Sequence, residues 1–260
     1  MGFLLATGCN QTTTTTFSDT SAATASAETI ELTVSAAASM QDAMKAIKPV
    51  YQEKNPDISI IYNFGSSGSL KQQIEQGAPA DVFLSASPKW IDALETENLL
   101  LEGKRQDLLK NTMVLITPAN SDQGISDFSA LSDSKVKKVA LGDPESVPAG
   151  QYAKEVLTSL NLYQPLETKY VFAKDVRQVL SYVETGNVDA GLVYGTDAKI
   201  AGDKVKVTAV APDNTHKPII YPVAIIKDTK NPEASQAFIE FLSSNQAKDV
   251  FEQYGFSMAK

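Results

Sequence analysis

The sequence predicts an α/β protein of two lobes, each with its own sheet, joined by a hinge that the chain crosses twice. From Glu31 onward, short apolar runs alternate with segments of helical spacing, a pattern typical of mixed or mostly parallel sheets flanked by helices. The chain has 260 residues, of which 43% are hydrophobic and 21% charged, which suits two globular domains. After the apolar segment 221–226, only one or two helices can follow, so the C-terminal end completes the first lobe.

The expected elements follow in chain order from the spacing of apolar residues. Each strand is a short apolar run, and each helix has apolar residues three or four positions apart, as Ala153, Val156, Leu157 and Leu160 do. The first lobe is expected to have strands at 31–38, 58–64 and 81–85 and helices at 39–51, 69–76 and 89–95. The second has strands at 113–117, 136–141, 169–172, 191–194 and 205–210 and helices at 151–160 and 176–185. A strand at 223–226 and a helix at 234–245 return to the first lobe.

The two crossings between the lobes are expected near residues 110–112 and 220–222. They divide the chain into a first lobe of residues 30–110 plus 222–260 and a second lobe of residues 111–221. Two crossings make a hinge, and the space between two hinged lobes is a common place for a ligand. We therefore expect a ligand cleft between the lobes.

The N-terminal segment 1–29 has the composition of a truncated lipoprotein signal followed by a flexible tether. An apolar run from Phe3 ends in small residues directly before Cys9, as at a bacterial lipoprotein processing site, where this cysteine carries the lipid. The alternative is a buried or incidental thiol. We prefer lipidation because the Thr-, Ser- and Ala-rich run after Cys9 is too polar and monotonous to pack a core. No stretch reaches the ~18 apolar residues of a transmembrane helix, so any membrane attachment would be through lipid alone.

Charge and residue counts argue against several classes of function. The formal net charge is −8, which disfavours a nucleic-acid partner. One cysteine and one histidine cannot supply a disulfide, a usual zinc site or a partnered catalytic base. The histidine, His216, lies in a turn-rich loop and is expected to be exposed. The chain is therefore not expected to be an enzyme, to hold a metal or to need a cofactor.

Four junctions between strands and helices have the features of an anion site. The turn from Gly142 to Gly150 contains no lysine or arginine and leads into a helix, whose first N–H groups, at Ala149 and Gly150, attract anions. Ser39 and Ser67 add hydroxyl groups at two further helix starts. The fourth junction is the helix start near residue 176. In addition, a strand ends on Tyr194. In open α/β sheets, ligands bind beyond the carboxyl ends of the strands, where all these residues fall.

Several longer segments resemble one family, the substrate-binding proteins of bacterial molybdate ABC importers. The segments that carry the resemblance stand in the family's order: Ala36-Ala37-Ala38-Ser39, Phe64-Gly65-Ser66-Ser67-Gly68-Ser69-Leu70, Gly77-Ala78-Pro79-Ala80-Asp81-Val82-Phe83, Gly142-Asp143-Pro144-Glu145-Ser146-Val147-Pro148-Ala149-Gly150, Val193-Tyr194-Gly195-Thr196-Asp197 and Tyr254-Gly255-Phe256.

The resemblance implies the type II periplasmic binding protein fold, with a tetrahedral molybdate or tungstate ion in the cleft. It further implies a periplasmic location, or one on the outer face of the cytoplasmic membrane, an ABC permease as partner, and a monomer. The ligand-binding residues carried over from the family are two serines that donate hydroxyl and backbone hydrogen bonds, two backbone N–H groups and one phenol: Ser39, Ser67, Ala149, Val176 and Tyr194. Gly68 departs from the family, which often has another small hydroxyl residue there, and this could loosen the loop.

Alternatives to molybdate remain open. A shell made only of donors penalises an oxyanion that still carries a proton, so phosphate should be disfavoured, whereas sulfate stays a competitor because only cavity size would reject it. The charged residues near the site are expected to be turn formers, helix-start charges or surface ion pairs and not ligands: Asp143, Glu145, Lys174, Asp175 and Arg177. A serine hydrolase using Ser39 or Ser67 lacks a base, and a transcription regulator would need a basic DNA-binding segment.

Overall fold

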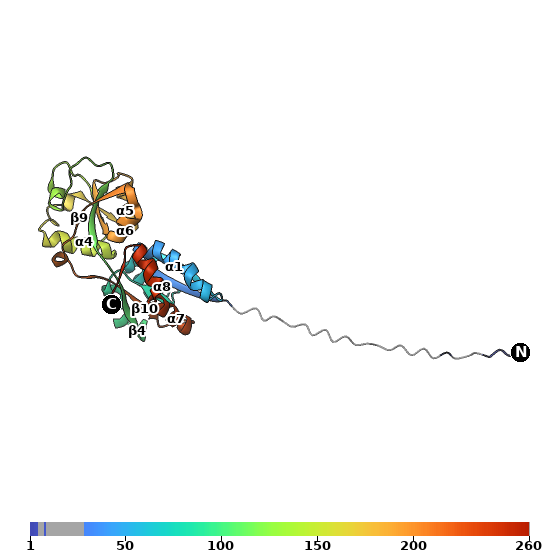
Figure 1. Ribbon diagram of the computed structural model, residues 1–260. Coiled ribbons are helices and arrows are strands. Elements are labelled where there is room, and N and C mark those ends of the chain that lie inside the picture. The colour runs from blue at the N-terminus through green and yellow to red at the C-terminus, as the bar shows by residue number, and fades with distance from the viewer. Residues whose placement is uncertain (5–7, 9–28, 260) are drawn as a thin grey trace.

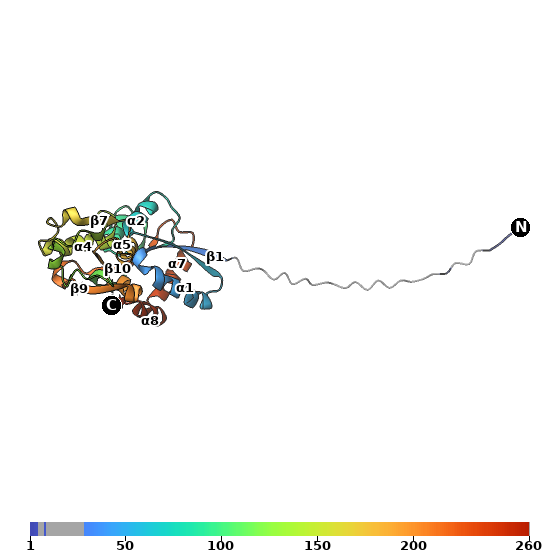
Figure 2. The same cartoon turned by 90° about the horizontal axis from the view of Figure 1, so that it is seen from above.

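The protein consists of two α/β lobes that lie side by side, as the computed structural model shows in two views (Figures 1 and 2). The structure describes residues 1–4, 8 and 29–259. The predicted lipidation site, Cys9, and residues 10–28 of the predicted tether lie outside the described residues. Within the described part of the chain, no helix is both long and apolar enough to span a membrane.

The first lobe is built on a six-stranded mixed sheet with the order β11-β4-β10-β3-β1-β2. β1 is parallel to both β2 and β3, and β10 is antiparallel to β3 and β4. Helices α1, α7 and α8 cover one face, whereas α2 and α3 cover the other, where Phe83 packs against Leu70 and Ile91. The elements of this lobe are β1 (Ile30–Ala37), a short 3-10 helix η1 (Ala38–Met40), α1 (Gln41–Lys54), β2 (Ile58–Gly65), α2 (Ser67–Glu75), β3 (Val82–Leu84), α3 (Pro88–Thr96), β4 (Leu100–Asn111), β10 (Ile219–Ile226), α7 (Pro232–Leu242), α8 (Asn245–Gln253) and β11 (Ser257–Met258).

The second lobe has a five-stranded mixed sheet with the order β7-β6-β8-β5-β9. β6 is parallel to β7 and β8, and β5 is antiparallel to β8 and β9. The elements are β5 (Met113–Pro118), β6 (Val139–Gly142), α4 (Pro148–Ser159), β7 (Tyr170–Ala173), α5 (Val176–Glu184), β8 (Ala190–Tyr194), α6 (Gly195–Ala201) and β9 (Val205–Val210), with 3-10 helices η2 (Ser129–Ser132), η3 (Glu167–Lys169), η4 (Gly202–Lys204) and η5 (Asp213–Thr215).

The chain passes between the sheets at two neighbouring places. It leaves the first sheet after Asn111 at the end of β4, and it returns from β9 to β10 at Ile219, which pairs with Asn111. The two crossing segments therefore run side by side. The lobe boundaries at 110/111 and 221/222 stay a prediction, and β10 begins before the second of them.

The sequence did not predict β4, β11, α6 and α8, nor the 3-10 helices of the second lobe. β4 was missed because a polar and charged run separates its two leucine pairs and gives no strand-like alternation, and most of its residues are at least partly exposed. Pairing with β10 and β11 therefore decides the strand. The two-residue strand β11 and the short helix α6 were also missed. The single C-terminal helix expected at 234–245 is two helices, because Ser244 caps α8 by accepting the Ala247 N–H at 3.3 Å.

Candidate functional site

A narrow cavity between the lobes collects the five residues that the sequence singled out. Its volume is about 10 Å³, close to the smallest space that holds one water molecule. The predicted ligand-binding residues all line it: Ser39 and Ser67 from the first lobe, and Ala149, Val176 and Tyr194 from the second. A larger open groove of about 750 Å³ lies along α4 and the loop 214–217, and none of the five lines it. The cavity is therefore the candidate site.

The N-terminus of α4 directs backbone N–H groups at this cavity. Pro148 occupies the first helical position, and Val147 before it provides no side-chain cap, so Ala149 carries one of the N–H groups that a helix start leaves unpaired. The turn before the helix is tight. A Cβ on Gly150 would lie 2.0 Å from the Gly142 carbonyl oxygen, so only glycine permits this approach. The backbone of Gly150 therefore packs directly against Gly142 at the start of α4.

Two further helix starts meet the cavity from opposite lobes. Asp175 caps α5 by accepting the Gln178 N–H at 2.9 Å, which places Val176 at the first helical position. Ser66 caps α2 in the same way, and Ser67 follows it as the first helical residue, fully buried. The Ser67 hydroxyl accepts the Ala86 N–H at 2.9 Å, so its own proton remains free for another acceptor.

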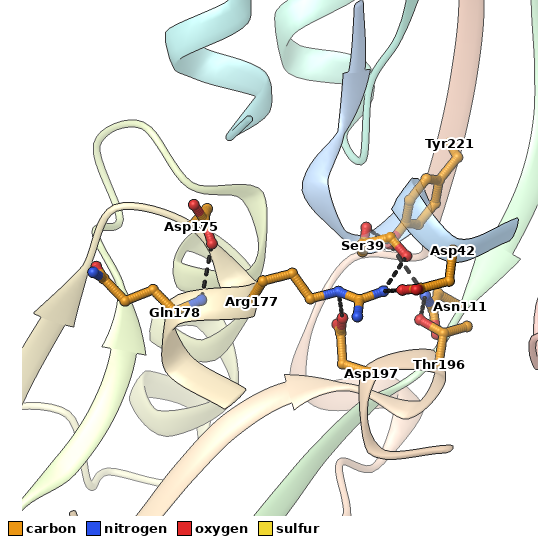
Figure 3. Close-up of polar contacts among 9 residues, drawn as sticks. All are labelled: Ser39, Asp42, Asn111, Asp175, Arg177, Gln178, Thr196, Asp197 and Tyr221. Atoms are coloured by element: carbon orange, nitrogen blue, oxygen red, sulfur yellow. Dashed lines mark hydrogen bonds and ion pairs between the residues drawn. The ribbon is translucent and has the colours of Figure 1, made fainter. Parts of the chain in front are cut away.

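Ser39 is held by residues from both hinge crossings. Its hydroxyl lies 2.9 Å from the Tyr221 hydroxyl, which in turn accepts a hydrogen bond from the Asn111 side-chain amide at 3.1 Å (Figure 3). The same amide donates to Thr196 Oγ1 at 2.9 Å. Sequence reasoning placed the crossings at these positions but assigned no role to Asn111 or Tyr221. Their polar side chains, at the two predicted crossings, were the signal that could have indicated such a role.

Tyr194 presents a buried hydroxyl that has no hydrogen-bond partner within residues 29–259. The side chain is 1% exposed, and its ring packs edge-on against Tyr221 with centroids 5.8 Å apart. Burial, followed by the neighbouring Tyr221, raises the pKa of the Tyr194 phenol well above its ordinary value. The phenol therefore keeps its proton and can act as a donor.

Arg177 bridges the lobes instead of forming the surface ion pair that the sequence suggested. Its guanidinium lies 2.7 Å from Asp42 Oδ2 of the first lobe and 2.8 Å from Asp197 Oδ1 of the second, and Nη2 donates to the Ser39 carbonyl oxygen at 3.3 Å (Figure 3). Asp197 is fully buried. Burial raises the pKa of its carboxyl group to about 6, although Arg177 opposes the shift. Arg177 is thus neutralised by two carboxylates and does not line the cavity.

The other charged or titratable residues near the cleft are not placed as ligands. Asp143 accepts the Glu145 N–H at 3.0 Å, as expected of a turn former. In the described part of the chain, Asp175 is the one charged residue that lines the cavity, and its carboxylate accepts the Gln178 N–H. His216 is partly buried, not exposed as expected, because it packs edge-on against Tyr152 at 6.1 Å. The part of the chain that the structure describes contains no group of three His, Cys, Asp or Glu side chains able to hold a metal ion.

Comparisons with known proteins agree with this architecture. The family model described as bacterial extracellular solute-binding protein matches residues 32–257. The chain is 46% identical over 255 residues to a Bacillus subtilis protein named as an ABC transporter substrate-binding lipoprotein (YvgL), covering 98% of this chain and 94% of that one. It is 42% identical over 237 residues to the molybdate-binding protein ModA of Haemophilus influenzae, covering 89% and 91%. A solved substrate-binding domain assigned to a molybdenum ABC transporter of Clostridium difficile is 47% identical, with a TM-score of 0.69 and coverage of 89% and 100%.

Proposed function

The chain belongs to the bacterial extracellular solute-binding protein family, and from that membership we propose that it binds molybdate or tungstate outside the cytoplasm and delivers the ion to an ABC permease. Relatives named as molybdate-binding proteins support the choice of ligand. The observation that carries the proposal is the cavity itself, where Ser39, Ser67, Ala149, Val176 and Tyr194 meet.

The chemistry of these five residues suits a small dianion. A dianion loses its hydration when the cleft closes on it, and only several well-aimed donors can replace that hydration. Two hydroxyls, one phenol and the N–H groups of helix starts are such donors, and helix dipoles add partial positive charge. Within residues 29–259, no lysine, arginine or histidine side chain lines the cavity. The donors therefore hold the anion without a full counter-charge.

The finer features of the proposal follow the same family logic. The protein acts as a monomer that needs no cofactor, catalyses no reaction and stays outside the cytoplasm. A lipid on Cys9 tethers it to the membrane. A relative named as a lipoprotein supports this anchoring. Metabolic labelling with a fatty-acid analogue, compared between the wild type and Cys9→Ser, tests the anchor, and equal labelling of the two would refute it.

The ligand is tested by thermal denaturation with molybdate, tungstate, sulfate, phosphate and amino acids. A ligand that binds only the folded protein raises its melting temperature with concentration. We expect a rise with molybdate and tungstate alone. A response to sulfate alone would replace the proposed ligand by the alternative, and no response to any oxyanion would refute an oxyanion site.

A pair of serine variants then places the ligand in the cavity. Ser67→Ala removes a hydroxyl that lines the cavity, whereas Ser69→Ala removes one from the same helix that does not. Calorimetry should show that Ser67→Ala weakens molybdate binding about tenfold, because one hydrogen bond to a charged group is lost. Ser69→Ala should leave the affinity unchanged. Equal effects of the two variants would place the ligand elsewhere.

A further inference from the structure

A chain of hydrogen bonds runs from the hinge to the candidate site. The Thr112 N–H donates to Asn111 Oδ1 at 2.9 Å, and Asn111 Nδ2 donates to the Tyr221 hydroxyl at 3.1 Å. The Tyr221 hydroxyl lies 2.9 Å from Ser39 Oγ (Figure 3). Tyr221 and Ser39 are both about 1% exposed, so the bond between their hydroxyl groups is shielded from water.

The first bond fixes the orientation of the Asn111 side-chain amide. A backbone N–H can only donate, so the Asn111 amide must turn its oxygen to Thr112 and its NH₂ group to Tyr221. Both N–H bonds of that group are used, because the second donates to Thr196 Oγ1 at 2.9 Å. The Tyr221 hydroxyl accepts from Asn111, and its one proton is available for Ser39 Oγ at 2.9 Å. When Ser39 Oγ accepts this proton in a hydrogen bond, the Ser39 hydroxyl directs its own proton at the cavity.

We propose that Asn111 and Tyr221 are positioning residues that fix Ser39 as a hydrogen-bond donor and so make the site select an oxyanion without protons. The proposal rests on the proposed function, because it assigns the selectivity of the same cavity. Ser67 is also oriented as a donor, because its oxygen accepts the Ala86 N–H. Each serine oxygen then has a neighbouring donor and each hydroxyl directs its proton at the cavity, so a protonated oxyanion meets donors where its own O–H group needs an acceptor.

Two variants test the direction of the hydrogen bonds in this relay, which runs from Asn111 through Tyr221 to Ser39. Tyr221→Phe removes the hydroxyl between Asn111 and Ser39, so Ser39 becomes free to accept. Asn111→Asp keeps the size of the side chain but replaces the donor that faces Tyr221 with an acceptor. The Tyr221 proton then turns to the carboxylate, and Ser39 donates to Tyr221 and presents a lone pair to the cavity.

The readout is the ratio of affinities for molybdate and for inorganic phosphate, measured by calorimetry at mildly alkaline pH, where phosphate is a dianion that keeps one proton. We expect Tyr221→Phe to weaken molybdate binding about tenfold and phosphate binding much less, because the lost bond oriented a donor toward a charged ligand. Asn111→Asp should lower the ratio of molybdate affinity to phosphate affinity further. A residue that only supports the fold would weaken both anions equally and leave the ratio unchanged.

Matched controls separate this role from general damage. Tyr62→Phe in the same lobe removes a phenol that donates to the Met44 carbonyl oxygen at 2.9 Å, outside the cavity, and should leave both affinities unchanged. Thr112→Asp adds the charge of Asn111→Asp at the next residue without replacing the amide, and should weaken both anions by a similar factor. Circular dichroism of each variant checks that it folds.

The outcomes distinguish failure of the relay from failure of the proposed function. Suppose that the wild type binds molybdate and that the ratio of molybdate to phosphate affinity is unchanged in both Tyr221→Phe and Asn111→Asp. This result would overturn the relay and leave the proposed function intact. Wild-type protein that binds sulfate and not molybdate would overturn the proposed ligand. Sulfate then serves as the unprotonated anion in the same comparison. Wild-type protein that binds neither would overturn both proposals.

Discussion

The substitution Tyr194→Phe should strengthen the ligand-free protein and weaken its binding. The Tyr194 hydroxyl is buried at the end of β8, lines the cavity and has no hydrogen-bond partner in the described part of the lobes. Phenylalanine keeps the ring and its edge-on contact with Tyr221 at 5.8 Å. The variant thus removes one polar atom and little else.

Tyr194→Phe should raise the stability of the ligand-free protein and lower its affinity for molybdate. Leaving a buried hydroxyl unpaired costs about 1–3 kcal/mol, so the variant should gain about 1 kcal/mol without ligand, a rise of roughly 2–4 °C in melting temperature for a domain of this size. A hydrogen bond to a charged ligand contributes about 1.5–3 kcal/mol, so the affinity for molybdate should fall roughly ten- to a hundredfold.

Scanning calorimetry without ligand and titration calorimetry with molybdate measure the two effects. Tyr170→Phe is the matched control, because the Tyr170 hydroxyl donates to the Tyr163 carbonyl oxygen at 2.8 Å, outside the cavity. The control should lose stability and keep its affinity. A Tyr194→Phe protein that behaves like the control would show that the hydroxyl is paired and is not a ligand donor, and the reasoning would fail.

Three further predictions concern the contacts between the lobes. In Gly68→Ala, a Cβ would lie 2.4 Å from the Ser146 carbonyl oxygen of the other lobe, so closure is blocked and calorimetry should show at least a tenfold loss of affinity, with little change in ligand-free melting. Unchanged affinity would contradict it. Arg177→Ala leaves the buried Asp197 carboxylate without its partner and should cost about 3 kcal/mol in denaturant unfolding, whereas Arg105→Ala, which loses two exposed carboxylate partners, should cost about 1 kcal/mol or less. Similar losses would show that burial is unimportant here. Burial raises the pKa of Asp197 from 3.8 to about 6, so the folded protein holds this proton more tightly than the unfolded chain does; the stability of the wild type relative to Asp197→Asn should be greatest below pH 3.8 and fall as the pH rises through about 6. A flat difference across that window in pH-dependent unfolding would refute the shift.

The sequence predicted the residues of the cavity because each belongs to a local signal. A helix start is visible in the chain as a turn, a small or capping residue and then apolar spacing, and Ser67, Ala149 and Val176 all stand at such starts. The rule that ligands bind beyond strand ends then predicted that they would lie together. The structure places all of them on one cavity.

The contacts that orient and close the site could not be predicted in this way. Ser39 and Tyr221 are 182 positions apart, and Asn111 and Tyr221 are 110 apart. No local pattern reports a pairing over such a distance in the sequence. The approach of Gly68 to Ser146 could not be predicted either, because the lack of a side chain at Gly68 suggested a looser loop. In the structure the Gly68 N–H donates to the Ser146 carbonyl oxygen at 3.0 Å, so glycine here tightens the contact between the lobes.

Among the described residues, no lysine, arginine or histidine lines the cavity, and we infer that this lets the proposed site discriminate between anions. The guanidinium of Arg177 sits beside Ser39 but is held by the carboxylates of Asp42 and Asp197. A free cation would attract any small anion, since Coulomb attraction depends on distance and only weakly on direction. Hydrogen bonds depend steeply on angle, so donors fixed by a helix start, by the Ala86 N–H and by the Asn111 amide respond to where the oxygens of an anion lie and to whether they carry protons. In a protein with a net charge of −8, such directional donors can favour one dianion, where charge alone would favour none.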